Sequence, residues 1–392
     1  MRKAVNYKNI GIYYFCICFL FSAWCVQSGS ERIDKINIPH LVINFPPIWL
    51  PFFLGVGILS YFIIDGKLKC DKLAILLLIR VILPLIPCIY TGEQKDFFGN
   101  YAITILCIIV YLIAYNNIED YEKIHNVLFM IFVLVIAQTL FESLLGTYSY
   151  FDDTYYYKND LTIPIGSSNL IGAIIIPCYA YLFCTSKNKK KKMILTLLML
   201  FAVGLTKSRS SVLVSVFILA LGVAWNGRMT IKRTILFTLL LFALVIVLFY
   251  FTMGSHLGGL VFYNNLSTVF GRGHLIQDGI NLFWRYPLTG GGFSEEVVVG
   301  NPHNIVIFTM MRAGLLGIIL LIIMVFAILN RFRFYFDDSI IKGCFCFMLC
   351  MFLQSMAEIV LYSYLCDFMF WFVCGIASGH IYRLNAYENL QI

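Results

Sequence analysis

Long apolar runs alternate with short polar segments along this whole chain. Most of the runs approach the ~20 residues that a helix needs to cross a hydrocarbon core. About twelve can be counted, at residues 10–28, 41–64, 73–90, 97–115, 124–146, 162–185, 193–206, 211–225, 235–253, 305–329, 341–361 and 364–383. The pattern predicts an all-α, polytopic membrane protein with about twelve transmembrane helices in one integral membrane domain, 1–392. The first run lacks a small-residue cleavage site and further spans follow it, so it predicts a retained span rather than a signal peptide.

The composition agrees with this class and excludes several others. Hydrophobic residues make up 60% of the chain and charged residues 13%, with a mean hydropathy of +0.84, whereas a soluble domain averages about 25% charged residues. Most of the 13 cysteines lie inside apolar runs, where they behave as small hydrophobes, and no CxxC pair or His/Cys ligand spacing occurs. The sequence therefore predicts no structural metal and no cofactor.

The basic residues predict the orientation. With the N-terminus inside, nineteen of the 29 basic residues fall in cytoplasmic segments, most densely at 187–192. Arg80 lies within a span, and nine basic residues fall on the outer side: Arg32, Lys35, Lys95, Lys158, Lys207, Arg209, Arg272, Arg285 and Arg312. This bias satisfies the positive-inside rule and predicts that both termini are cytoplasmic. A net charge of +8 distributed in this way indicates a membrane topology rather than a nucleic-acid partner.

The orientation places the longest polar segment, about 254–304, on the outer face between spans nine and ten. Long, non-repetitive loops carry function more often than mere connection. Within it, apolar residues at helical spacing over 275–285 predict an interfacial helix. The KSRSS hairpin at 207–211, between the short spans seven and eight, falls on the same face. Arg209 and Arg272 could therefore clamp a pyrophosphate together, or could simply bind lipid headgroups.

The stretch GNPHN, at 300–304, ends this outer loop just before a span. His303 could be a turn residue that caps the helix. It could equally act as a general base, because histidine changes charge near neutral pH. In the second interpretation Asn304 holds the imidazole ring and Pro302 fixes the approach to the helix.

Ionisable residues inside spans are further candidates, because such groups are costly in lipid. Glu142, Glu358 and Asp367 lie toward the outer ends of their spans, and Arg80 is the deepest charge. The acids could pair with each other or with outer arginines, and Arg80 could pair with an acid or reach a carrier lipid. The aromatic and acidic loop at 147–161 could contact sugar, although an interfacial aromatic belt explains its tyrosines equally well.

Three landmarks in order carry a family resemblance: TKSRSS at 206–211, GRGHLIQDGINLFWRYPLTGGGF at 271–293, and PHN at 302–304 followed by MRAGLLGIILL. Together they resemble the O-antigen polymerase (Wzy) and O-antigen ligase superfamily, over about 165–380. The resemblance implies an inverting, metal-independent glycosyl transfer at the outer face of a bacterial inner membrane. The donor would be a glycan on undecaprenyl pyrophosphate and the acceptor a sugar hydroxyl.

Carried over position by position, Arg209 and Arg272 match the family arginines proposed to bind pyrophosphate, and His303 matches the histidine implicated in activating the acceptor. Arg285, Asn304, Glu358 and Arg80 are further substrate-binding candidates. The implied partners are the lipid-linked donor and acceptor, membrane lipid and a chain-length regulator protein, with no nucleic acid.

Three functions remain open. A polymerase joins the growing chain to another lipid-linked repeat unit, whereas a ligase transfers finished chain to lipid A core. The aromatic, cysteine-rich N-terminal half favours a polymerase matched to one repeat unit. A flippase for the lipid-linked repeat belongs to another class. Such transporters typically carry internal repeats and charged, broken helices near the midplane, whereas no repeat is visible in this sequence and its polar residues gather at the outer face.

Overall fold

Helices form at eleven of the twelve predicted apolar runs, and the remaining run, 235–253, lies outside the described residues. The computed structural model describes residues 9–30, 32–91, 94, 96–145, 149–150, 159–223, 273–300 and 302–388. The eleven helices are α1 (Ile10–Trp24), α2 (Trp49–Ile64), α3 (Lys72–Ile82), α4 (Phe97–Asn117), α5 (Tyr121–Leu145), α6 (Ser168–Thr185), α7 (Lys189–Thr206), α8 (Arg209–Val223), α12 (Ile305–Phe332), α13 (Ser339–Ser355) and α14 (Tyr364–Glu388).

The remaining elements are short. They are the 3-10 turns η1 (Ile33–Lys35), η2 (Leu83–Leu85), η3 (Pro87–Ile89) and η5 (Arg333–Tyr335), the helix α11 (Glu295–Val299) and the strands β1 (Cys25–Gln27), β2 (Leu41–Ile43), β3 (Ser149–Tyr150), β4 (Asn159–Asp160), β5 (Thr162–Ile163) and β6 (Gly166–Ser167). Residues 273–285 are helical, in agreement with the helix expected over 275–285.

Local polar residues start several of the long helices. The side chain of Asn188 accepts from two backbone N–H groups at the start of α7, and that of Asp338 does the same for α13. Asp71 accepts from the Ala74 N–H at the start of α3. Such caps satisfy donors that the first turn leaves without helical partners.

Two predicted runs begin with extended backbone rather than helix. In the run 41–64, β2 pairs in parallel with β1, with Cys25 opposite Leu41, and α2 begins only at Trp49. In the run 162–185, β5 and β6 form a hairpin before α6 begins at Ser168. Hydrophobicity alone cannot separate these strands from the helices that follow, because both are apolar.

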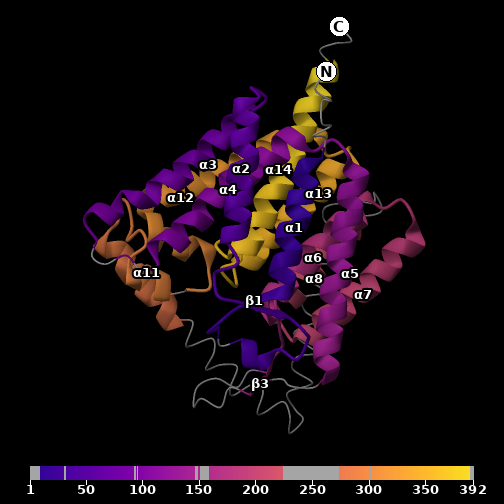
Figure 1. Ribbon diagram of the computed structural model, residues 1–392, viewed down its shortest axis with the longest axis horizontal. Coiled ribbons are helices and arrows are strands. Elements are labelled where there is room, and N and C mark those ends of the chain that lie inside the picture. The colour runs from indigo at the N-terminus through magenta and orange to yellow at the C-terminus, as the bar shows by residue number, and fades with distance from the viewer. Residues whose placement is uncertain are drawn as a thin grey trace.

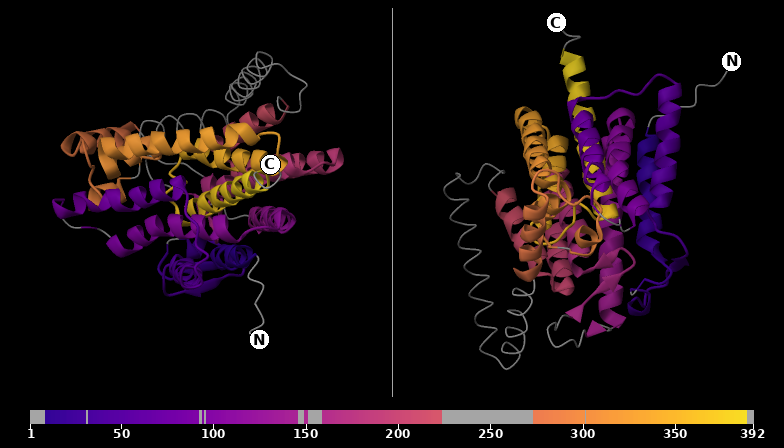
Figure 2. Two further views of the ribbon diagram at one scale, coloured as in Figure 1. Left: turned by 90° about the horizontal axis from the view of Figure 1, so that it is seen from above. Right: turned by 90° about the vertical axis from the view of Figure 1, so that its left-hand side faces the viewer.

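The core is built on two close helix pairs, α6 with α13 and α4 with α14. Gly375 and Gly379 of α14 face the backbone of α4, and a Cβ at either position would lie 2.5 Å from the carbonyl oxygen of Tyr111 or Tyr115. A small-xxx-small spacing of this kind lets membrane helices approach closely. In Figures 1 and 2, α14 (yellow) runs through the middle of the bundle, between the indigo N-terminal helices and the orange α12.

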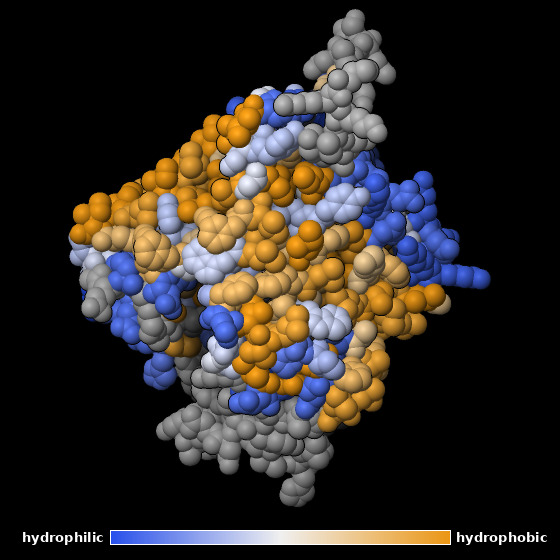
Figure 3. All heavy atoms as spheres, viewed as in Figure 1, coloured by the Kyte–Doolittle hydropathy of each residue, from blue (hydrophilic) through white to orange (hydrophobic). Residues whose placement is uncertain are grey.

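The outside of the bundle is apolar. A broad hydrophobic surface covers the face shown in Figure 3, and large side chains such as Phe53, Ile64, Phe98 and Phe326 are 64%, 86%, 77% and 67% exposed. Such a surface is suited to lipid rather than water. Among the described residues, six helices are long and apolar enough to cross a membrane, and α1, α2, α8 and α13 are shorter apolar helices. Twelve spans therefore stay a prediction.

The two ends of the bundle differ in charge. At one end, Arg331 pairs with Asp71, His380 bonds to Asp338 and Lys191 contacts His125. The lysines of 189–192 lie at this end, where α7 begins. The opposite end carries the start of α6, the start of α8 and the start of α12, which together form the site described below.

Candidate functional site

The loop 302–304 leads into α12 through an uncommon backbone conformation. His303 has φ +50°, in the left-handed region that residues other than glycine adopt infrequently. Asn304 is the N-cap of α12, where its Oδ1 accepts from the N–H groups of Val306 at 2.9 Å and Ile307 at 3.2 Å. Its Nδ2 donates to the carbonyl of Met356 at 3.0 Å. The cap thus fastens the start of α12 to the segment that follows α13.

Glu358 holds the imidazole of His303. The Nδ1 of His303 lies 2.6 Å from Oε1 of Glu358, and the two side chains are 29% and 15% exposed. The amide of Asn304 contacts the first turn of α12 and Met356, so the described contact that holds the ring comes from Glu358, and the expected role of Asn304 stays a prediction. A carboxylate reaches the ring because residues after α13 fold back toward the start of α12.

The same carboxylate joins His303 to the predicted KSRSS hairpin. Nδ2 of Asn169, at the start of α6, donates to Oε2 of Glu358 at 2.7 Å, and Oδ1 of Asn169 accepts from the hydroxyl of Ser208 at 2.7 Å. Asn169 and Ser208 are 8% and 2% exposed. Four side chains from four separate segments therefore form one hydrogen-bonded chain, His303–Glu358–Asn169–Ser208.

The hairpin itself is held by buried hydroxyls. Ser211 donates to Ser208 at 2.8 Å, and Nε2 of Gln354, on α13, donates to Ser210 at 2.8 Å. Gly172 of α6 leaves the room for this, since a Cβ there would lie 1.9 Å from Oγ of Ser211. Arg209 is the first residue of α8 and is exposed, between Ser208 and Ser210. Arg209 is therefore presented from a fixed backbone.

Other predicted site residues are placed differently. Arg272 lies outside the described residues, so its pairing with Arg209 stays a prediction. Arg285 is exposed and forms an ion pair with Glu296 at 2.8 Å. Most of the 147–161 loop also lies outside the described residues. Glu142, which is 1% exposed, accepts from the backbone N–H of Asn37 at 2.9 Å and from that of Ile38 at 3.2 Å, and so holds the loop between α1 and α2.

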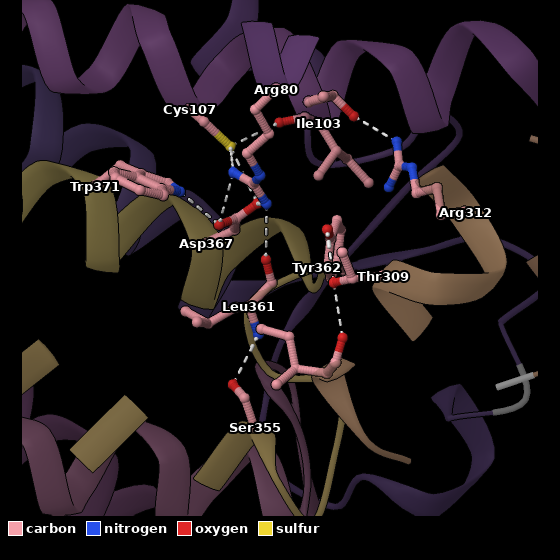
Figure 4. Close-up of polar contacts among 12 residues, drawn as sticks. Arg80, Ile103, Cys107, Thr309, Arg312, Ser355, Leu361, Tyr362, Asp367 and Trp371 are labelled. Carbon is pink, nitrogen blue, oxygen red and sulfur yellow. Dashed lines mark hydrogen bonds and ion pairs between the residues drawn. The ribbon is translucent and has the colours of Figure 1, made fainter. Parts of the chain in front are cut away.

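Arg80 pairs with an acid, as one of its two interpretations proposed. Its Nη2 lies 2.9 Å from Oδ2 of Asp367, with the side chains 13% and 2% exposed. Asp367 also accepts from Nε1 of Trp371 at 2.8 Å, and Arg80 donates to the Leu361 carbonyl at 3.3 Å. Figure 4 shows this cluster, and Leu361 lies three residues after Glu358. The Arg80 cluster therefore borders the His303 site.

Arg312 is not an outer-loop residue, contrary to the sequence-based count. It lies inside α12 and is 5% exposed. Its Nη2 donates to Thr104 at 2.6 Å, and its guanidinium lies over the ring of Phe293, 4.4 Å from the centroid. The count failed because Arg312 lies only seven residues into its span. So close to the end of a span, the sequence does not show whether a basic side chain faces the outer side of the membrane or the interior of the bundle.

Sequence reasoning also missed Asn169, Gln354 and Ser208. Asn169 and Gln354 are amides near the ends of apolar helices. This position was the signal available in the sequence, because a buried polar group requires a hydrogen-bond partner. The partners themselves are far apart in the chain, Asn169 and Glu358 by 189 residues, and no spacing rule connects them.

The arrangement combines the parts of a proton-transfer site beside a fixed cation. A carboxylate that accepts from Nδ1 of a histidine favours the tautomer whose Nε2 carries the lone pair. Arg209 adds a permanent positive charge suited to phosphate oxygens.

Comparison with known proteins matches a part of the chain that includes Ser208, Arg209 and His303, whereas Asn169 and Glu358 lie outside it. Residues 194–322 match the family model Wzy_C, described as O-antigen ligase, and this match covers about a third of the chain. No curated protein matches the sequence. The three landmark motifs all lie inside the matched residues. The match indicates a membrane enzyme of the O-antigen ligase or polymerase type, and over residues 194–322 it confirms the predicted resemblance to the Wzy and O-antigen ligase superfamily.

Proposed function

We propose that this protein is a surface-polysaccharide polymerase that joins repeat units carried on undecaprenyl pyrophosphate. The observation that carries the proposal is the chain His303–Glu358–Asn169–Ser208, which links a candidate base to the arginine-bearing hairpin of the matched region. A transfer of sugar from a pyrophosphate requires both a base for the attacking hydroxyl and positive charge for the leaving group.

In the proposed reaction the acceptor hydroxyl oxygen attacks the anomeric carbon of the donor sugar. The bond from that carbon to the pyrophosphate oxygen breaks, with inversion at the carbon. The hydroxyl proton passes to Nε2 of His303, and Glu358 stabilises the resulting imidazolium through Nδ1. Arg209 and Arg272 bind the departing undecaprenyl pyrophosphate, and no metal or cofactor takes part in this scheme.

The charge of the two ends supports an outer-face site. Arg331, Lys191 and Arg383 lie at the end of the bundle opposite His303, and basic residues favour the cytoplasmic side of inner membranes. The proposal therefore places both termini in the cytoplasm and the reaction on the periplasmic face.

A ligase that transfers glycan to lipid A core is the second candidate, because the matched family model is described as O-antigen ligase. We favour the polymerase because of the part of the chain that precedes the match, which begins at residue 194. The aromatic N-terminal half before it suits an enzyme built for one repeat unit.

Gene deletion followed by gel analysis of lipopolysaccharide tests the proposal. A polymerase deletion leaves core carrying a single repeat. A deleted ligase leaves bare core with lipid-linked polymer accumulating, and a deleted flippase leaves no lipid-linked repeat on the outer face. Complementation with His303→Ala should leave the single-repeat pattern at normal protein abundance. His40→Ala is the matched control, because His40 is a half-buried histidine whose Nδ1 lies 2.7 Å from the nearby backbone carbonyl of Ile38. A full ladder from the His303 variant would contradict the assignment of the base.

A further inference from the structure

A pocket lies inside the bundle beside α12, next to the His303 site. It contains about 710 Å³ of space not filled by protein atoms, part of it continuous with the surroundings. Its lining begins at Ile305, directly after the Asn304 cap, and continues along α12 to Ile328. The residues proposed for base and leaving-group contacts, His303 and Arg209, are not among those that line it.

The polar part of the pocket carries an excess of positive charge. Its charged lining residues are Arg80, Arg312 and Asp367, two cations and one anion. Asp367 lies 2.9 Å from Arg80, so the pair is already balanced. The Arg312 guanidinium is bonded to the neutral Thr104 hydroxyl, and its Nε has no hydrogen-bond partner among the described residues. Among the described residues no carboxylate forms an ion pair with Arg312. A buried cation without a directly paired counter-charge is costly in a membrane and is a functional candidate.

The two guanidinium groups share one aromatic ring. Arg80 lies 4.9 Å and Arg312 5.1 Å from the centroid of Tyr362. Figure 4 shows Tyr362 and Thr309 near the two arginines, and the hydroxyl groups of these two residues lie 3.4 Å apart. An anion in the pocket would meet Arg312 together with the hydroxyl groups of Thr309 and Tyr362, which line the pocket as well.

A break in α12 fixes the position of Arg312. Gly314 has φ +60° and ψ −152° inside the helix. Around it, the N–H groups of Gly291 and Gly292 donate to the carbonyls of Met311 and Arg312 at 2.7 and 3.0 Å, and that of Leu315 donates to the Pro287 carbonyl at 2.8 Å. The outer segment 287–292 thereby replaces the helical bonds. Broken helices at membrane depth are tolerated where protein or a cavity surrounds them, and commonly form binding sites.

The rest of the pocket is a single apolar groove. Beyond Arg312 the lining on α12 consists of Ala313, Gly317, Leu320, Leu321, Met324, Val325 and Ile328, the inward side of one helix. The stretch from 313 to 328 spans ~20 Å at a rise of 1.5 Å per residue. A groove along one helix suits one hydrocarbon chain better than the paired chains of a phospholipid.

We propose that this pocket holds the polyprenyl chain of the acceptor substrate, with its phosphate groups at Arg312. This rests on the proposed polymerase function, in which donor and acceptor both carry a polyprenyl pyrophosphate. The donor pyrophosphate belongs to the Arg209 side of the site. The second lipid enters beside Ile305, one residue past the Asn304 cap and two past His303, so that its glycan can reach the base. The protein therefore binds two polyprenyl pyrophosphates at once.

Native mass spectrometry of the purified full-length protein with added undecaprenyl pyrophosphate tests this. Wild type should bind two molecules. Arg312→Gln should bind one, with at least a tenfold weaker dissociation constant for the second. Leu321→Trp fills the groove without touching either arginine, and should also bind one even if Arg312→Gln fails to fold. Phe326→Trp is the matched control: it enlarges a 67% exposed side chain on the outer side of the same helix and should bind two.

Three results would overturn the proposal: a single bound molecule in wild type, two in both pocket variants, or equal displacement by phosphatidylglycerol, which would indicate a general phospholipid site. Binding is measured without turnover, so the two proposals fail separately. Two bound lipids with no polysaccharide ladder defect on gene deletion would contradict the polymerase. A His303-dependent ladder with one bound lipid would contradict the pocket alone.

Discussion

Replacing Glu358 by glutamine separates the positioning of His303 from the fold around it. The carboxylate has two acceptors in use, Oε1 toward His303 at 2.6 Å and Oε2 toward Asn169 at 2.7 Å. Glutamine has one carbonyl oxygen and one NH2 group, so it can accept from Nδ1–H of His303 or from Nδ2–H of Asn169 but not from both. When its carbonyl accepts from Asn169, its NH2 group faces Nδ1 of His303 and favours the tautomer whose Nε2 is protonated. It also removes the negative charge that faces the imidazolium during proton transfer.

The bond geometry sets the expected size of the effect. A hydrogen bond to a charged group contributes about 1.5–3 kcal/mol. Both side chains are mostly buried, 29% and 15% exposed, so solvent compensates for little of this loss. Because ~1.4 kcal/mol corresponds to a tenfold change in rate, we expect kcat to fall roughly 10- to 150-fold. The Michaelis constant should change little, since the imidazolium forms only in the transition state.

Purified enzyme with a defined undecaprenyl-pyrophosphate-linked repeat gives the measurement, as the initial rate of polymer formation against substrate concentration. Glu358→Asp keeps the charge on a shorter side chain and should lose less than Glu358→Gln. If Glu358→Gln left kcat unchanged at normal abundance, or raised only the Michaelis constant, the carboxylate would not position the base.

Three further substitutions test the packing around the site. Asp367→Asn leaves the Arg80 guanidinium without the carboxylate at 2.9 Å. Because breaking a buried pair costs about 3–5 kcal/mol, the thermal unfolding midpoint of the detergent-purified protein should fall. An unchanged midpoint would show that the pair is dispensable. Gly314→Ala places a Cβ 2.5 Å from the backbone of Leu288 at φ +60° and should sharply reduce membrane abundance on immunoblots, while Gly99→Ala, with nothing within 4 Å, should not. Glu142→Gln removes the charge that accepts from Asn37 and Ile38, so limited trypsin digestion at the exposed Arg32 should speed up; equal rates would show that other contacts hold the loop.

The positions of the helices followed from the sequence because membrane burial depends on composition over a whole span. The break at Gly314 did not, because apolar residues continue through it and hydropathy does not register a change of φ. The backbone tolerates the break because residues 287–292 supply the hydrogen bonds that the helix lacks there, and that contact is tertiary.

The sequence predicted individual residues of the candidate site but not the hydrogen bonds between them. Histidine and arginine near the ends of spans stand out against an apolar chain, and His303 and Glu358 are linked through Asn169 to Ser208, the residue before Arg209. Pairings such as Arg80 with Asp367, 287 residues apart, depend on which helices are neighbours. The sequence therefore offers the ionisable groups but not their partners.

The break in α12 also bears on how the chain is made. Residues 287–292 leave the ribosome before 311–316, and the hydrogen bonds between them close a loop of only about 25 residues, which costs little entropy. The open carbonyls and N–H groups of the broken helix can thus be satisfied as soon as α12 reaches the membrane, before α13 and α14 join the bundle. The loop and the first half of α12 therefore act as one insertion unit, and Arg312 enters the bilayer with its surroundings already half assembled.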